Sequence, residues 1–238
     1  MTYQPELATD YYGQNIKGWL FSEKFDGIRA YWTGTELLTR TGKHIDCPNW
    51  VTAGLPRFPI EGELWAGRAQ FQKVLSALRS GQDGDWSDIK LMAFDAPQAG
   101  VAFADRVKTL EALSFVNIVK QIAVSGKREM KRLVREIIAN GGEGGVLRNP
   151  ASLHVAGKSD DYARVKPVLC AEATVLGHVG TTTGKTSLLC EYNGESFRLH
   201  TSQAKQISAG ASVTFSYYGL TDAGKPRQPQ FVAVRDYE

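Results

Sequence analysis

The sequence predicts an α+β protein of two domains, and three observations support this fold class. Residues 1–167 combine short apolar runs typical of strands with stretches of helical periodicity. Residues 168–238 lose the helical periodicity and keep only short alternating runs separated by turn residues. The composition, with 42% hydrophobic and 22% charged residues, is that of a globular chain. We therefore expect a larger mixed domain at 1–167 and a small all-β domain at 168–238.

The elements of the first domain follow one another in a mixed order. Residues 19–32 alternate polar and apolar side chains around Asp26-Gly27, which predicts two strands joined by a tight turn. The run 90–95 predicts a buried strand, and the glycine-rich stretch 141–145 predicts a loop that leads into another strand. Apolar side chains at helical spacing predict three helices, at 68–81, 103–113 and 127–138.

The second domain shows strand patterns alone. Its predicted strands cover residues 173–178, 187–192, 197–201, 211–217 and 231–234. Five short strands in a segment of this size indicate a small antiparallel barrel, for which the oligonucleotide-binding (OB) fold is the five-stranded candidate. Residues 180–186 (GTTTGKT) look like a phosphate-binding loop, but they have one intervening residue too few and no helix follows. We therefore predict a hairpin turn there.

Composition excludes several classes of protein. No apolar run is long enough for a transmembrane helix, and the first residues show no secretory signal pattern. A leader removed before the first residues stays possible, so these observations leave the compartment open. Cys47, Cys170 and Cys190 form no CxxC pair, so we expect neither a zinc site nor a disulfide framework. Three packed thiols are the expectation, with one Cys170–Cys190 bridge as the alternative.

One short motif combines a lysine with a sharp turn and an arginine. In Glu23-Lys24-Phe25-Asp26-Gly27-Ile28-Arg29, the amine of Lys24 becomes a nucleophile once a nearby cation or desolvation lowers its pKa. Taken alone, the motif fits a surface hairpin with a solvated lysine equally well. Further segments rich in charge and glycine follow it in order: 39–43 (TRTGK), 61–64 (EGEL), 94–95 (FD), 143–146 (EGGV) and 164–167 (RVKP).

This ordered set resembles the covalent nucleotidyltransferase superfamily of ATP-dependent DNA ligases, RNA ligases and mRNA capping enzymes. The motifs span residues 23–167, and the predicted barrel extends the resemblance to nearly the whole chain. The chain length and the segments 63–71 and 224–229 are similar to the minimal bacterial ATP-dependent DNA ligases of the Lig E type. The resemblance implies an enzyme that seals 5′-phosphate/3′-hydroxyl nicks in duplex DNA through lysyl-AMP and a DNA-adenylate. It further implies ATP and Mg²⁺ as cofactors, nicked DNA as partner, no membrane association and a monomer. For the compartment it suggests the bacterial periplasm, for a mature form without its leader, with the cytoplasm as the alternative.

The resemblance also implies a role for each motif residue. Lys24 would attack the α-phosphorus of ATP, and Lys166 and Arg164 would complete the catalytic set. Arg164 departs from the family pattern, which has lysine there, and a guanidinium differs from an ammonium in reach and geometry. The residues implied to bind ATP or AMP are Glu23, which would help to place the adenine edge through its backbone, and Arg29, Arg40, Glu63, Phe94, Glu143 and Lys166.

Metal, DNA and pyrophosphate contacts are implied in the same way. Glu143 and Glu63 are the implied ligands of Mg²⁺, for which Mn²⁺ would substitute, because hard cations prefer carboxylate oxygens. The implied DNA contacts come from Arg40, Lys43 and Arg68. The implied contacts that orient the leaving pyrophosphate come from Arg227 and Arg235.

Ordinary structural roles compete with some of these assignments. Phe94 alone fits a buried strand, and Glu143 alone fits a solvated loop; the ordered set favours the functional role for both. The basic residues of 127–135 are more typical of a solvated helix face than of a DNA contact.

Two rival functions remain at this stage. A capping-type guanylyltransferase or an RNA ligase would share the lysine motif, and it would prefer GTP or act only on RNA. A non-catalytic protein that binds nicks or single strands would form no covalent nucleotide and would tolerate Lys24→Ala. The two acids and the nucleophile would then have no explanation, so this rival ranks last.

Overall fold

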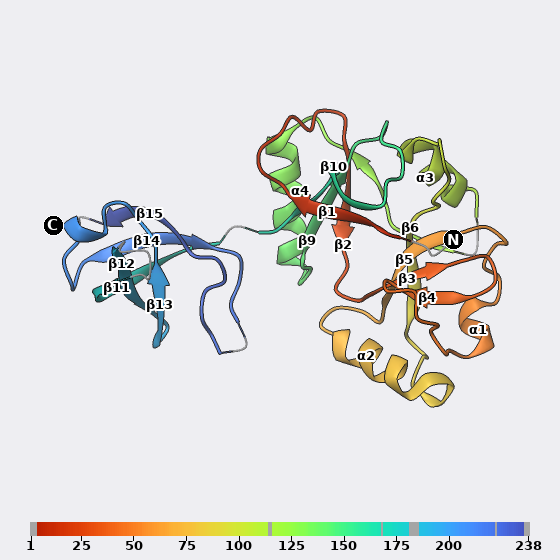
Figure 1. Cartoon of the computed structure of the whole chain (residues 1–238), viewed down its shortest axis with the longest axis horizontal. Helices are drawn as coiled ribbons and strands as arrows, with labels where there is room; N and C mark the ends of the chain where they lie inside the picture. Colours follow the sequence, from red (N-terminus) through yellow and green to blue (C-terminus); the bar gives the residue numbers. More distant parts are fainter. Residues whose placement is uncertain (1–3, 114–115, 168, 181–185, 222, 236–238) are drawn as a thin grey trace. The chain divides into compact units, whose positions relative to one another are not determined.

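A computed structural model describes residues 4–113, 116–167, 169–180, 186–221 and 223–235. The chain forms two compact units, Met1–Lys166 and Pro167–Glu238 (Figure 1). The expected mixed α+β class is confirmed, because sheets dominate both units and helices occur beside them in the first. None of the helices among the described residues is long and apolar enough to cross a membrane.

The first unit is built on two five-stranded sheets. One has the order β1-β10-β9-β2-β8, and the other has the order β4-β3-β5-β6-β7. The first sheet comprises β1 (Glu6–Asp10), β2 (Leu20–Lys24), β8 (Ile122–Ala123), β9 (Gly144–Arg148) and β10 (Gly157–Val165). The second comprises β3 (Ile28–Trp32), β4 (Leu37–Thr39), β5 (Ile60–Trp65), β6 (Lys90–Asp95) and β7 (Asn117–Ile118). Neighbouring strands are antiparallel except for β1–β10 and β6–β7, which are parallel.

The motif that contains Lys24 connects the two sheets. The predicted strands on either side of Asp26-Gly27 do form, but β2 pairs with β9 and β8 while β3 pairs with β4 and β5. The turn therefore carries the chain from one sheet to the other. Gly27 is required at this crossing, since a Cβ there would lie 2.2 Å from the carbonyl oxygen of Leu64.

Helices cover the sheets through their apolar stripes. The helices are α1 (Asn49–Thr52), α2 (Phe71–Ser80), α3 (Phe103–Glu111) and α4 (Lys127–Ala139), with a short 3₁₀ turn η1 (Gly81–Asp83). The three predicted helices correspond to α2, α3 and α4. Val74 of α2 packs into a core with Leu64 and Trp86, and Met130 of α4 packs into a second core with Phe21 and Leu147. Burial of these apolar stripes is the main stabilising contribution to each helix.

The second unit contains one five-stranded antiparallel sheet in the order β13-β12-β11-β14-β15. Its strands are β11 (Leu169–Gly180), β12 (Thr186–Tyr192), β13 (Glu195–Leu199), β14 (Ser212–Tyr217) and β15 (Gln230–Arg235), with a 3₁₀ turn η2 (Ala204–Gln206). They lie where the sequence predicts five strands, and Val175, Leu188 and Phe215 are in their core. The predicted hairpin turn at 180–186 falls mainly on residues 181–185, which lie outside the described residues.

The three cysteines are free thiols, so the alternative Cys170–Cys190 bridge is not formed. The expectation of three packed thiols is correct for buried Cys190 and half-buried Cys47 but wrong for Cys170. Cys170 is exposed because it lies at the start of β11, where Leu169 is also exposed.

Candidate active site

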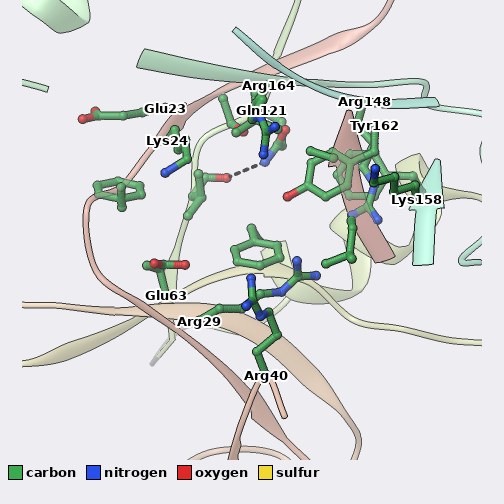
Figure 2. Close-up of a pocket in the computed structure, with 18 residues that line it drawn as sticks. Glu23, Lys24, Arg29, Arg40, Glu63, Gln121, Arg148, Lys158, Tyr162 and Arg164 are labelled. Carbon is green, nitrogen blue, oxygen red and sulfur yellow. Dashed lines mark hydrogen bonds between the residues drawn. The ribbon is translucent and has the colours of Figure 1, made fainter. Parts of the chain in front are cut away.

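A cavity of about 350 Å³ in the first unit is lined by residues of both sheets. Seven of the predicted site residues line it: Glu23, Lys24, Arg29, Arg40, Glu63, Phe94 and Arg164. They lie far apart in the sequence, and the crossing of the chain between the sheets brings them together (Figure 2). The cavity wall is charged around Lys24 and Glu63, and it includes apolar side chains such as Phe94 and Val146.

Lys24 ends β2 and forms an ion pair with Glu143. Its Nζ lies 2.5 Å from Oε2 of Glu143, and about a third of each side chain is exposed. The register places Lys24 opposite Gly144, so the glycine-rich loop presents Glu143 directly to the lysine. Gly145, the second residue of β9, leaves no room for a side chain, because a Cβ there would lie 2.2 Å from the ring of Phe21.

Glu63 adds a second carboxylate beside Lys24. It lies on β5, opposite Arg29 of β3, and its side chain lines the cavity. Burial raises the pKa of Glu63 to about 7, and the charge of Glu143 contributes in the same direction while Lys24 and Arg29 oppose it. Because the charge of Glu143 opposes ionisation of Glu63, an added cation beside these two carboxylates would favour the ionised form of Glu63.

Phe94 and Arg29 form one wall of the cavity. Phe94 belongs to the half-buried face of β6, whereas Ala93 and Asp95 on its other face are buried. The guanidinium carbon of Arg29 lies 5.3 Å from the centroid of the Phe94 ring. Nη2 of Arg29 also donates a hydrogen bond to Oε1 of buried Glu61, at 2.8 Å. Arg29 therefore supports the aromatic ring and is itself held in place.

Glu23 and Arg68 form an ion pair with each other. Side chains alternate along β2, so the side chain of Glu23 lies on the opposite face from that of Lys24. Arg68 lines a separate cavity of about 270 Å³ together with Asp26, Trp65 and Glu143. Glu143 therefore lies beside both Lys24 and this second cavity.

Arg40 and Lys43 lie in the turn after β4. Both are exposed, and Arg40 lines the cavity whereas Lys43 does not. The turn is held by backbone hydrogen bonds between Thr39 and Lys43 and between Gly42 and Thr39.

Arg164 and Lys166 differ in their placement. Arg164 lines the cavity but also forms a two-pronged ion pair with Asp10 of β1, at 2.5 and 3.2 Å, which lowers the pKa of Asp10. Lys166 follows the end of β10 and is not among the residues that line either cavity. The positive charge of Lys166 also contributes to lowering the pKa of Asp10.

Arg227 and Arg235 belong to the second unit. Arg227 is exposed, and its backbone bonds to Gly219 and Tyr218. Nε of Arg235 donates to Oγ1 of Thr214 at 2.6 Å and lies 3.1 Å from Oε1 of Glu172.

Sequence reasoning missed a buried ionic cluster behind Phe94. Asp95 accepts hydrogen bonds from Arg106, at 2.7 and 3.1 Å, and from Arg148 at 2.7 Å, and Arg148 also pairs with Glu6. The guanidinium of Arg148 lies 4.5 Å from the Phe103 ring centroid and 4.4 Å from that of Tyr162. The charges come from β1, β6, β9 and α3, and nothing in the local sequence pattern joins them. The cluster fixes the end of β6 that carries Phe94.

The cavity brings together the amine of Lys24, the carboxylate of Glu63, several guanidinium groups and an aromatic ring, and Glu143 joins the site through its ion pair with Lys24. An amine beside carboxylates is equipped for nucleophilic substitution at phosphorus, where positioning and charge neutralisation supply most of the catalysis. The aromatic wall is suited to a nucleobase.

Comparison with known proteins agrees with this chemistry. No family model matches the chain. It is 31% identical over 237 residues to the DNA ligase of Haemophilus influenzae, with 93% of this chain and 88% of the relative covered. A solved Lig E DNA ligase is 36% identical, with 99% of this chain and 100% of that chain covered and a TM-score of 0.71. A solved Chlorella virus DNA ligase-adenylate is 24% identical with full coverage of both chains and a TM-score of 0.62, which shows likeness of fold alone.

Proposed function

The chain belongs to the minimal ATP-dependent DNA ligases of the Lig E type, and on that premise we propose that Lys24 carries the adenylate with which it seals nicks in duplex DNA. The observation that carries this proposal is the position of Lys24 in the cavity wall, 2.5 Å from Glu143 and beside Glu63. All the residues assigned below belong to a single copy of the chain. The groups to be joined are the 5′-phosphate and the 3′-hydroxyl of a nick.

The first step is attack of the Lys24 amine on the α-phosphorus of ATP. The nitrogen–phosphorus bond forms as the bond to pyrophosphate breaks, and pyrophosphate leaves with the electron pair. Lys24 must lose a proton first, and Glu143 lies within hydrogen-bond reach to accept it. AMP then passes to the 5′-phosphate, and the 3′-hydroxyl displaces it to close the strand.

The carboxylates of Glu63 and Glu143 fit a magnesium ion. Mg²⁺ is commonly held by one or two carboxylates plus substrate phosphates and water. Glu143 pairs with Lys24, and Glu63 lies close enough to both for their charges to affect its pKa, so two carboxylates are available at one place. Bound Mg²⁺ supplies positive charge that neutralises the phosphate oxygens. The raised pKa of Glu63 means that its carboxylate is only partly ionised near neutral pH until a cation arrives.

Three further motif residues receive roles from their positions. Phe94 stacks on the base, Arg29 holds the ring of Phe94 in place, and Arg40 contacts the phosphates from the turn after β4. We assign the second unit to the OB fold, with the domain boundary at 167, and we assign Arg227 and Arg235 to the pyrophosphate and Lys166 to the α-phosphate. Arg68 and Lys43 are assigned to DNA.

A gel assay of nick sealing tests the proposal. A 5′-labelled nicked duplex is incubated with Mg²⁺ and either ATP, GTP or NAD⁺. We expect sealing with ATP alone, no sealing by Lys24→Ala, and unchanged sealing by Lys17→Ala, a control at an exposed lysine outside the cavity. Sealing restricted to RNA or driven by GTP would favour the RNA ligase or capping-type rival. Equal sealing by Lys24→Ala would contradict the assigned nucleophile.

A further inference from the structure

Gln121 is a polar residue of the cavity wall that belongs to none of the sequence motifs. It lies between β7 and β8, is half-buried and lines the cavity that contains Lys24 (Figure 2). β8 pairs with β2 in the register Leu20↔Ala123 and Phe21↔Ile122, and the same register continued places Gln121 opposite Ser22. Ser22 and Lys24 share a face of β2, two residues apart, and both line the cavity. Gln121 therefore lies beside the strand that carries Lys24, opposite the position two residues before it.

The amide of Gln121 is held in one orientation. Its Nε2 donates a hydrogen bond to the carbonyl oxygen of Val119 at 3.2 Å, which Figure 2 draws as a dashed line. Rotating the amide by half a turn would place Oε1 against that carbonyl oxygen. Two acceptors would then face each other, and the hydrogen bond would be lost. Gln121 consequently keeps Oε1 as an acceptor and one N–H as a donor in a fixed arrangement.

We propose that Gln121 reads the purine base and selects adenine over 6-oxo purines, an inference that rests on the ATP-dependent function proposed above. Adenine offers the N6 amino group as donor beside a ring nitrogen acceptor, and a carboxamide matches this pair with one donor and one acceptor. Hypoxanthine and guanine offer the 6-oxygen as acceptor beside N1–H as donor. A free amide would rotate to match them, but the bond to Val119 opposes that rotation.

Other side chains of the cavity are less suited to this selection. The carboxylate of Glu23 is paired with Arg68, and that of Glu63 lies beside Lys24, where we assign it to Mg²⁺. Phe94 and Val146 contact a base through its face, which all purines share. The hydroxyls of Ser22 and Tyr162 rotate and can serve as donor or acceptor. Cationic side chains only donate, so they would favour the 6-oxygen rather than the amino group.

Calorimetric titration with ATP and with ITP tests the proposal, because ITP differs from ATP only at the 6-position and N1. Lys24→Ala serves as the parent, since it binds nucleotide without forming an adduct. We compare it with Lys24→Ala carrying Gln121→Leu, Gln121→Met as a second and more adaptable substitution, or Gln72→Leu as a control at an exposed glutamine of α2. The parent and the control should prefer ATP, and both Gln121 variants should lose roughly 10- to 100-fold of that preference.

Two results would overturn the proposal. One is a parent with equal affinity for ATP and ITP. The other is a folded Gln121 variant that keeps the parent's ratio of the two affinities within about twofold. If Gln121 had a purely structural role, its substitution would weaken the binding of ATP and of ITP equally and leave the ratio of the two affinities unchanged. Failure of the ligase function is seen separately, as absence of an AMP adduct on wild-type Lys24, because the affinity ratio is measured in proteins that form no adduct.

Discussion

Two ion pairs of the first unit differ in how far their side chains are exposed to solvent. Lys24 and Glu143 are each about one third exposed, whereas the side chains of Arg106 and Asp95 are 0% exposed. Solvent screens the first pair, which contributes little to stability and can separate when substrate arrives. The second is desolvated, so loss of either partner leaves an uncompensated charge in the interior. Burial, rather than the type of charge, therefore distinguishes the reactive pair Lys24–Glu143 from the pair Arg106–Asp95, which stabilises the fold.

The comparison predicts its largest effect on activity at Lys24. Lys24→Arg keeps a cation beside Glu143 but removes the primary amine, so we expect no detectable adenylate. Unfolding by urea should change by less than about 0.5 kcal/mol, because the site is solvent-accessible. A residual adenylate in this variant would contradict the assignment of the nucleophile, and a large loss of stability would contradict the view that the pair is dispensable to the fold.

The largest effect on stability is expected at the buried cluster. Asp95→Asn removes the charge that Arg106 and Arg148 share, and breaking a buried pair costs about 3–5 kcal/mol. Urea denaturation checks this value. Glu143→Gln, the matched change in the exposed pair, should cost less than about 1 kcal/mol. Similar costs for the two variants would remove the distinction drawn from burial.

For Glu63 we predict a pH-dependent effect on stability, intermediate in size between those expected for Lys24→Arg and Asp95→Asn. The folded pKa of about 7 lies above the ordinary value of a glutamate, so the folded state loses stability as pH rises from about 4.5 and the full penalty is present above 7. Glu63→Gln removes this penalty. We expect stabilisation by at most about 3 kcal/mol at pH 8 and by almost nothing at pH 4, together with slower adenylation. Thermal unfolding at both pH values measures the stability difference between the variant and the wild type. An equal difference at the two pH values would contradict the raised pKa of Glu63.

The smallest effect is expected for the Asp10–Arg164 pair. Both side chains are substantially exposed, so Asp10→Asn should destabilise the fold by about 1 kcal/mol or less, with the loss confined to pH values above the carboxyl's lowered pKa. The same change frees the guanidinium of Arg164 beside the cavity. Adenylation rates in low and high salt measure the consequence, and a salt-independent rate would argue against any contact between Arg164 and phosphate.

Local pattern and ordered motifs accounted for much of the fold and site. The five strands of the second unit and the helices of the first unit arise from alternation and helical spacing, which are properties of contiguous residues. The gathering of Lys24, Glu63 and Phe94 followed from the motif order. What the sequence could not reveal depends on pairing between distant strands. Whether β2 and β3 share a sheet is one example, and the partners of Asp95 are another.

Gln121 shows the same limit at the scale of one side chain. It belongs to no motif, and its importance appears only when β8 pairs with β2 and its amide bonds to Val119. Lys166 shows the converse, because its motif is clear in the sequence while its side chain is not in the wall of either cavity. A motif identifies the chemistry of a residue, and its placement depends on the fold around it.

The most direct test of the central claim is the intact mass of the nucleotide-stripped chain after incubation with Mg²⁺ and ATP, followed by peptide mapping. We predict a gain of one AMP, located on the peptide that contains Lys24 and absent after incubation with GTP or NAD⁺. A folded protein that gains no mass, or gains AMP on another residue, would contradict the account.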